Sequence, residues 1–156
     1  MVSREEFEHF FDRLGAEGVT STEVERNMWR VRQDGALDYD LVVTFAPPVV
    51  LLRAKVMDRP DDAAADARLA RRLLELNASD LLHGAYGFDQ GTVVLTDALE
   101  LAHLDYEEFR TSFESMTLAL TGHVRELAAC CASDGAAADA VHGLPHAAPT
   151  ASAEAR

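Results

Sequence analysis

The sequence has few of the residues on which several classes of protein depend. Its 156 residues include two cysteines, Cys130 and Cys131, which are adjacent. Neighbouring cysteines bridge each other only with strain, so a disulfide framework is excluded. No stretch approaches the roughly 18 apolar residues of a membrane-spanning helix. The N-terminus has no basic region followed by an apolar one, so we expect no signal peptide and a protein of the reducing cytoplasm.

Positive charge is also scarce. Lysine and arginine total 14 against 27 acidic residues, which gives a net charge of −13, and Lys55 is the only lysine. Nucleic-acid binding depends on phosphate neutralisation by lysine and arginine, and anionic membranes attract basic segments. We therefore expect neither a nucleic acid nor a membrane as a partner.

Catalytic and cofactor-binding motifs are missing as well. The chain has no Gly-x-Ser-x-Gly, no phosphate-binding glycine loop and no dinucleotide fingerprint. Four histidines fall in four different segments, and His142 and His146, which are four positions apart, have Gly143 and Pro145 between them. The acidic clusters lack the pattern of a calcium loop, so we interpret both the histidines and the acidic residues as solvated groups. We expect no enzymatic activity, cofactor or metal. The alternatives left open are an enzyme with paired carboxylates and a redox pair at Cys130 and Cys131.

The composition that remains is that of an ordinary globular protein. Hydrophobic residues make up 48% and charged residues 26% of the chain. A chain of this length buries enough surface to fold as one domain without disulfides or metals. From Ala132 onward alanine dominates and no apolar period remains. We therefore predict one domain over residues 1–131 and a flexible tail over 132–156.

Local patterns predict the elements of this domain. Ser3 and Glu6 form a capping box, Asp34-Gly35 is a hairpin signal, and Pro47-Pro48 marks a turn. We predict helices over residues 3–15, over a segment that begins within 58–62 and ends at about 76, and over 105–131. We predict strands over residues 22–33, 37–45, 49–57, 81–88 and 92–96. The order α-β-β-β-α-β-β-α predicts an α+β fold, a five-stranded antiparallel sheet with three helices.

Such a sheet, with its helices mostly on one side, leaves its other face uncovered. Apolar side chains on that face would mark a site for a partner. The alternative is that these side chains complete an ordinary core.

Residues 73–128 carry a resemblance to known proteins. The segments that carry it are Leu73-Leu74-Glu75-Leu76-Asn77, the strand from Leu82 to Asp89, Gly91-Thr92-Val93-Val94-Leu95, Leu99-Glu100-Leu101, Leu104-Asp105 and the long helix that follows. In this order they resemble the small acidic chaperones of bacterial type III secretion, the Tir-chaperone group. They are also similar to YbjN-like domains, which share that fold. The resemblance covers roughly residues 3–130.

The resemblance implies a non-enzymatic homodimer that holds a non-globular segment of a client protein in an extended state. Carried over by element, it implies a client-binding groove at Phe7, Phe11, Leu14, Trp29, Val31 and Leu41. It implies a dimer interface at Leu69, Leu73, Leu76 and Leu82. The alternative function is a YbjN-like regulatory or adaptor module that binds a folded protein partner.

Overall fold

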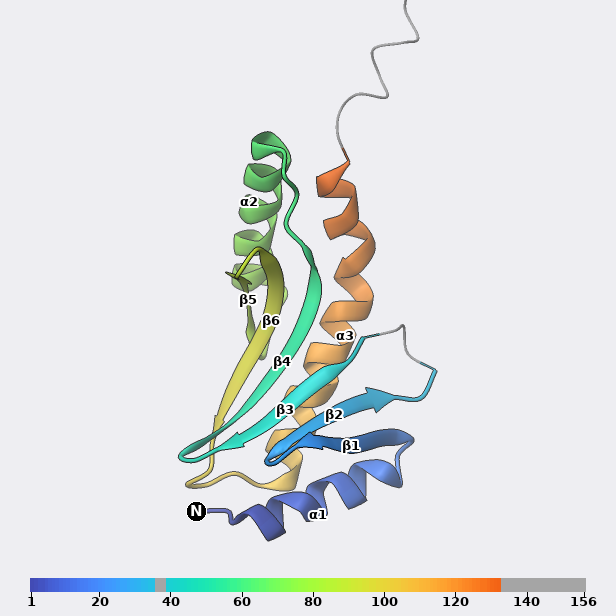
Figure 1. Ribbon diagram of the computed structural model, residues 1–156, viewed down its shortest axis with the longest axis vertical. Helices are drawn as coiled ribbons and strands as arrows, with labels where there is room; N and C mark the ends of the chain where they lie inside the picture. Colours follow the sequence, from blue (N-terminus) through green and yellow to red (C-terminus); the bar gives the residue numbers. More distant parts are fainter. Residues whose placement is uncertain (36–38, 133–156) are drawn as a thin grey trace, which may run out of the picture.

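The computed structural model describes residues 1–35 and 39–132, which form three helices and one sheet (Figure 1). In chain order the elements are α1 (Arg4–Gly15), β1 (Val19–Glu25), β2 (Met28–Gln33), β3 (Leu41–Ala46), β4 (Val49–Asp58), α2 (Ala63–Ser79), β5 (Ala85–Asp89), β6 (Thr92–Glu100) and α3 (Tyr106–Cys131). Residues 36–38 and 133–156, and with them nearly all of the predicted tail over 132–156, lie outside the described residues.

The sheet is antiparallel throughout, with the strand order β1-β2-β3-β4-β6-β5. The α+β class and the three helices are confirmed, but the prediction of five strands is wrong because the sheet has six. The predicted strand over 22–33 is two strands joined by a tight turn. Asn27 takes a left-handed conformation there, with φ of 66°, which asparagine tolerates better than most residues. The Glu23 carboxylate accepts a hydrogen bond from the Asn27 backbone N–H at 3.1 Å and supports the turn.

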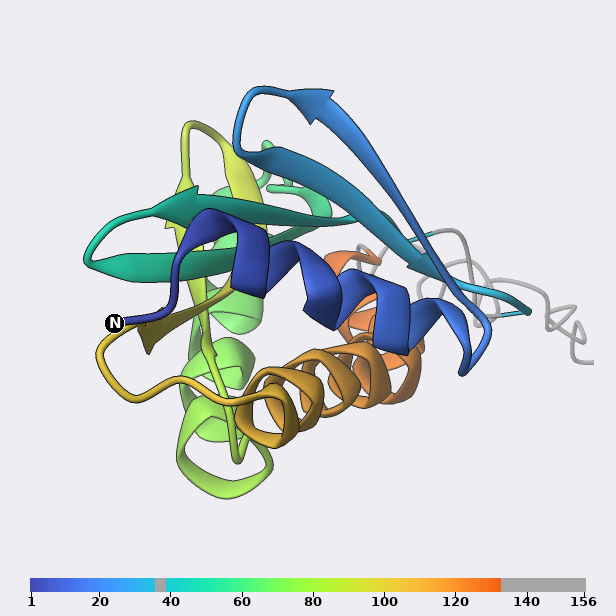
Figure 2. The same cartoon turned by 90° about the horizontal axis from the view of Figure 1, so that it is seen from below.

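All three helices cover one face of the twisted sheet, as Figure 2 shows from below. Their apolar sides meet the inward side chains of the strands in a single core. Phe7 of α1 lies at its densest point, with its ring centroid 5.0 Å from that of Phe109 in α3 and 5.8 Å from that of Phe45 in β3. The pair with Phe109 is edge-to-face and the pair with Phe45 is tilted, and aromatic rings at these distances attract each other beyond their burial. This cluster joins α1 and α3 to the sheet.

Side-chain caps set where the helices begin. The predicted capping box at α1 is confirmed, since Ser3 and Glu6 exchange side-chain to backbone hydrogen bonds. Asp62 and Asp105 accept hydrogen bonds from the backbone N–H groups of Ala65 and Glu108, at the starts of α2 and α3. Each cap satisfies a backbone donor that has no partner inside its helix.

The junction between α2 and β5 differs from the prediction. The predicted helix ends at about residue 76, but α2 continues to Ser79 and Asp80 follows as its cap. The Asn77 amide instead pairs with the backbone of Tyr86, donating to its carbonyl at 3.0 Å and accepting from its N–H at 2.7 Å. One side chain thereby takes the place of a neighbouring strand and fixes β5 against α2.

Candidate functional site

The six residues of the predicted client groove lie in the core of the domain. Phe7, Phe11, Leu14, Trp29, Val31 and Leu41 are each at most 6% exposed. Five of them belong to α1 and β2, in and around the aromatic cluster, and Leu41 belongs to β3. In this conformation none of the six presents a surface to a partner, and their contact with a client stays a prediction.

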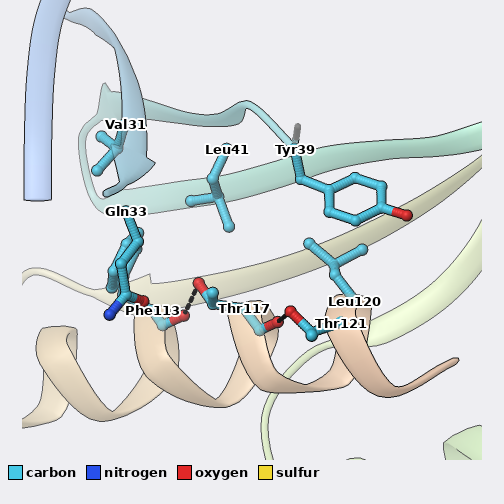
Figure 3. Close-up of a pocket in the computed structure, with 8 residues that line it drawn as sticks. All are labelled: Val31, Gln33, Tyr39, Leu41, Phe113, Thr117, Leu120 and Thr121. Atoms are coloured by element: carbon cyan, nitrogen blue, oxygen red, sulfur yellow. Dashed lines mark hydrogen bonds between the residues drawn. The ribbon is translucent and has the colours of Figure 1, made fainter. Parts of the chain in front are cut away.

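Two of these residues line a small internal cavity between β2, β3 and α3 (Figure 3). The cavity of about 10 Å³ is enclosed by Val31, Gln33, Tyr39, Leu41, Phe113, Thr117, Leu120 and Thr121. The hydroxyls of Thr117 and Thr121 donate to carbonyls one turn back in α3, so they offer no free donor to the cavity. Burial raises the pKa of the Tyr39 hydroxyl. The volume admits about one water molecule and no larger ligand.

The predicted dimer residues divide into two groups. Leu69, Leu73 and Leu76 form the buried stripe of α2, whereas Leu82 is 89% exposed in the segment after α2. Their role in a dimer also stays a prediction. The large apolar residue that α2 exposes is Leu74, whose side chain is 69% exposed. Leu74 does not share the helical spacing of Leu69, Leu73 and Leu76, so it lies on another side of the helix.

The uncovered face of the sheet carries a group of apolar and small side chains that we call the outer sheet face. It comprises Val42, Thr44 and Ala46 of β3, Val49 and Leu51 of β4, and Ala98 of β6, all half-buried or exposed. Leu51, at 42% exposed, pairs across the sheet with Thr44 on one side and Ala98 on the other. These neighbours are small, so the leucine stands above them. The face therefore offers apolar contact beside three central strands.

Two strands end the sheet. Among the described residues, β1 pairs with β2 alone and β5 with β6 alone. A strand at an edge presents backbone N–H and C=O groups that can bind another extended chain. The β1 edge is seven residues long, which is enough to direct an added strand.

A second apolar surface lies where α2 meets β5, and we call it the α2–β5 patch. Leu74 and Phe88, which is 39% exposed, border a depression of about 260 Å³ whose walls include Ala70, Leu73 and Tyr86. The Arg59 guanidinium lies 4.0 Å from the Phe88 ring centroid. Pattern analysis of the sequence did not single out Leu51, Leu74 or Phe88, because exposure of one apolar residue beside a buried stripe depends on how the elements pack.

Ser112, Asp97 and His83 form a polar cluster whose order differs from that of a catalytic triad. Ser112 is buried and donates to the Asp97 carboxylate at 2.6 Å, while His83 lies 3.9 Å from the same carboxylate. A nucleophilic triad needs the histidine between the serine and the acid, and here the acid is in the middle. Within residues 1–35 and 39–132, no three His, Cys, Asp or Glu side chains are grouped to hold a metal ion. The same part of the chain contains no helix with the length and apolar character required to cross a membrane.

Comparison with protein families gives a match to CesT_Tir_1 over residues 3–133. No curated protein matches the chain.

Several solved structures share the fold. The ExsC–ExsE complex contains a chain with a TM-score of 0.61 and 18% identity; the match covers 81% of this chain and 97% of that one. The ExoU–SpcU complex from the type III secretion system of Pseudomonas aeruginosa gives 0.58 and 14%, covering 78% and 94%. YbjN, a putative transcription regulator from E. coli, gives 0.58 and 18%, covering 80% and 93%. At these identities the likeness concerns the fold.

Proposed function

Since the chain belongs to the CesT_Tir_1 family of type III secretion chaperones, we propose that it is a non-enzymatic, cytoplasmic chaperone. It binds a non-globular segment of a client protein and keeps that segment soluble. The observation that carries the proposal is the outer sheet face, where a domain with a filled core still leaves Leu51 and its apolar neighbours uncovered.

The sheet suits an extended client better than a folded one. An added strand at β1 would satisfy its backbone groups by β-augmentation, while alternate side chains meet the apolar face. The client would reach the protein as a chain whose own backbone donors and acceptors are unpaired. Solved complexes with this fold include a chaperone–effector pair, HopA1–SchA, matched with a TM-score of 0.55 and 12% identity.

We further propose that the chaperone is a homodimer that associates through the α2–β5 patch. The patch contains both a protruding leucine, Leu74, and a depression of about 260 Å³ that a leucine side chain can enter. A two-fold axis brings the same surface of each copy together, so that one surface must carry both the protruding side chain and the depression that receives it. The proposed dimer interface still lies on α2, as the sequence predicts. It uses the exposed side of the helix at Leu74 and not the buried leucines.

Affinity capture from the native lysate tests the client proposal. We expect one dominant partner whose bound segment has no structure of its own. Leu51→Asp places a charge on the outer sheet face and should reduce capture about tenfold or more. Ala102→Asp, an exposed position outside that face, is the matched control and should leave capture unchanged.

The YbjN-like alternative is favoured by the similar TM-score of 0.58 for that structure. It predicts a partner that is folded on its own and is captured equally by the Leu51→Asp variant. Either of these results, with the variant's thermal unfolding unchanged, would contradict the chaperone proposal.

A further inference from the structure

Leu118 stands on the solvent side of α3 between two depressions. It is 75% exposed, while its neighbour Leu120 is buried in the core. On one flank the depression holds about 490 Å³ and is lined by Gln33, Asp34, Gly35, Glu114, Thr117 and Thr121. On the other flank it holds about 300 Å³ and is lined by Asp80, Leu81, Leu82, Ser115, Ala119, Gly122 and His123. We call Leu118 with these two depressions the α3 crevice; three residues of the first depression, Gln33, Thr117 and Thr121, are drawn in Figure 3, where the Gln33 side chain extends from β2 toward α3.

The crevice is shaped to receive apolar side chains. Its second depression has small residues of α3 along its floor, Ser115, Ala119 and Gly122, at helical spacings of four and three. Residues at these spacings share one side of a helix, and small ones let another chain approach closely. Leu82 forms the far wall and is 89% exposed. Two leucines with so much exposed surface add nothing to the core and are available to a partner.

Carboxylates predominate among the charged groups that line the crevice. Among the described residues, the lining contains three carboxylates, Asp34, Asp80 and Glu114, and neither lysine nor arginine. Glu114 pairs with Arg110 at 2.9 Å, and Asp80 lies 3.7 Å from His123. Both carboxylates are about half exposed, at 52% and 47%, so a partner can still reach them. Together with a net charge of −13, this rim attracts a basic segment and repels an acidic one.

We propose that the α3 crevice binds a basic segment of a second protein partner, with two apolar side chains that straddle Leu118. A helix with its side chains is about 10–12 Å wide. An extended chain advances about 3.3 Å per residue and its alternate side chains share a face, so anchors four positions apart lie on one side of the chain and span about 13 Å, roughly the width of the helix. This site lies on the helical side of the domain, opposite the outer sheet face, and its argument does not depend on the client proposal.

Fluorescence anisotropy with a labelled peptide tests this site on the full chain. The probe is a short peptide with two leucines four positions apart between arginines; matched peptides carry serines for the leucines or glutamates for the arginines. We expect the arginine–leucine peptide alone to bind. Leu118→Asp should weaken it about tenfold or more. Glu114→Gln should weaken it less and reduce its dependence on salt, because a charge–charge attraction is lost.

Control variants separate the crevice from the other surfaces. Leu74→Asp on the α2–β5 patch and Leu51→Asp on the outer sheet face should bind the peptide as the wild type does. If either abolishes binding, or if Leu118→Asp leaves it unchanged, the site is elsewhere and the proposal is overturned. Equal binding of the glutamate peptide, or no peptide binding, also overturns it. If Leu118→Asp instead dissociates a dimer in sedimentation, the crevice is covered by a second copy of the chain and not by a basic segment.

Discussion

Single residues that join α3 to the sheet show how much one hydrogen bond contributes. Ser112 is fully buried on α3 and donates to the Asp97 carboxylate of β6 at 2.6 Å. The Asp97 side chain is only 16% exposed, so water replaces a lost donor poorly. A carboxylate in this setting depends on the hydrogen bonds that the protein provides.

We expect Ser112→Ala to lower the free energy of unfolding by about 1.5–3 kcal/mol, the usual range for a hydrogen bond to a charged group. Ser115→Ala is the matched control, since it makes the same change in the same helix at a half-buried position. Urea unfolding of the three proteins measures the difference. Equal stabilities of the two variants would show that the bond to Asp97 contributes little.

A second residue prediction concerns pH. The Arg59 guanidinium donates to both carboxylate oxygens of Asp66 at 2.9 and 2.5 Å, and this hydrogen bonding lowers the pKa of Asp66. A lowered carboxyl pKa stabilises the fold above the unfolded-state pKa, and this contribution is lost as pH falls through the folded-state value. Asp66→Asn should therefore be less stable than the wild type at neutral pH.

The same variant should lose less stability on acidification below about pH 4. Unfolding free energies across this range, with Asp61→Asn as an exposed control in the same segment, measure the effect. Parallel curves for the wild type and Asp66→Asn would contradict it.

Residue patterns predicted the local contacts well and the distant ones poorly. The capping box between Ser3 and Glu6 spans three positions and can be recognised in the sequence. The bonds from Asn77 to the Tyr86 backbone span nine and depend on where β5 lies against α2. The same limit applies to Leu118 and Leu74, because helical period separates buried from exposed positions only after the packing partners are known.

At the scale of elements, the conformation of one glycine controls the entry to β5. Gly84 has φ of +76°, and a Cβ built there would lie 2.8 Å from the backbone oxygen of Thr96 in β6. Gly91, in the turn between β5 and β6, has a similar φ of +82° but open space around it. The two positions therefore differ in steric contact and not in backbone conformation.

We expect Gly91→Ala to cost about 1–2 kcal/mol, the penalty of a left-handed conformation for a residue with a Cβ. Gly84→Ala should cost about 1–3 kcal/mol more, because β5 must move away from β6. Chemical unfolding of both variants measures the difference. A cost for Gly84→Ala no larger than that for Gly91→Ala would mean that β5 relaxes freely.

The elements themselves were predicted where their ends carry polar or turn residues. All three helices and the strands on either side of Pro47-Pro48 lie close to their predicted positions. The turn at Asn27 was missed, because a single asparagine with no glycine beside it is a weak signal compared with Asp34-Gly35. Its left-handed backbone turns one long predicted strand into β1 and β2 and adds the sixth strand.

At the scale of the whole molecule, the account places three partners on three surfaces. We propose that the outer sheet face binds the client, the α2–β5 patch binds a second copy, and the α3 crevice binds a basic segment. The sequence predicted a binding protein through composition, missing motifs and family resemblance. It placed the client contacts on α1 and the meander, whose named residues are buried in this conformation.

The dimer proposal predicts a particle of twice 17.0 kDa in solution. Leu74→Asp should shift sedimentation to a single chain, because two patches that carry charge at their centre repel each other. Ala102→Asp should remain a dimer. A wild-type protein that sediments as a single chain at every concentration would contradict the dimer, and a Leu74→Asp variant that stays dimeric would place the interface on another surface.

The most direct test of the central claim is amide hydrogen exchange of the captured client segment, measured free and in complex with the full chain. The account predicts that the free segment exchanges as an unfolded chain. It predicts that one continuous stretch becomes protected on binding, and that Leu51→Asp removes this protection. A segment that is already protected when free would show that the partner is folded, and would contradict a chaperone that holds its client in an extended state.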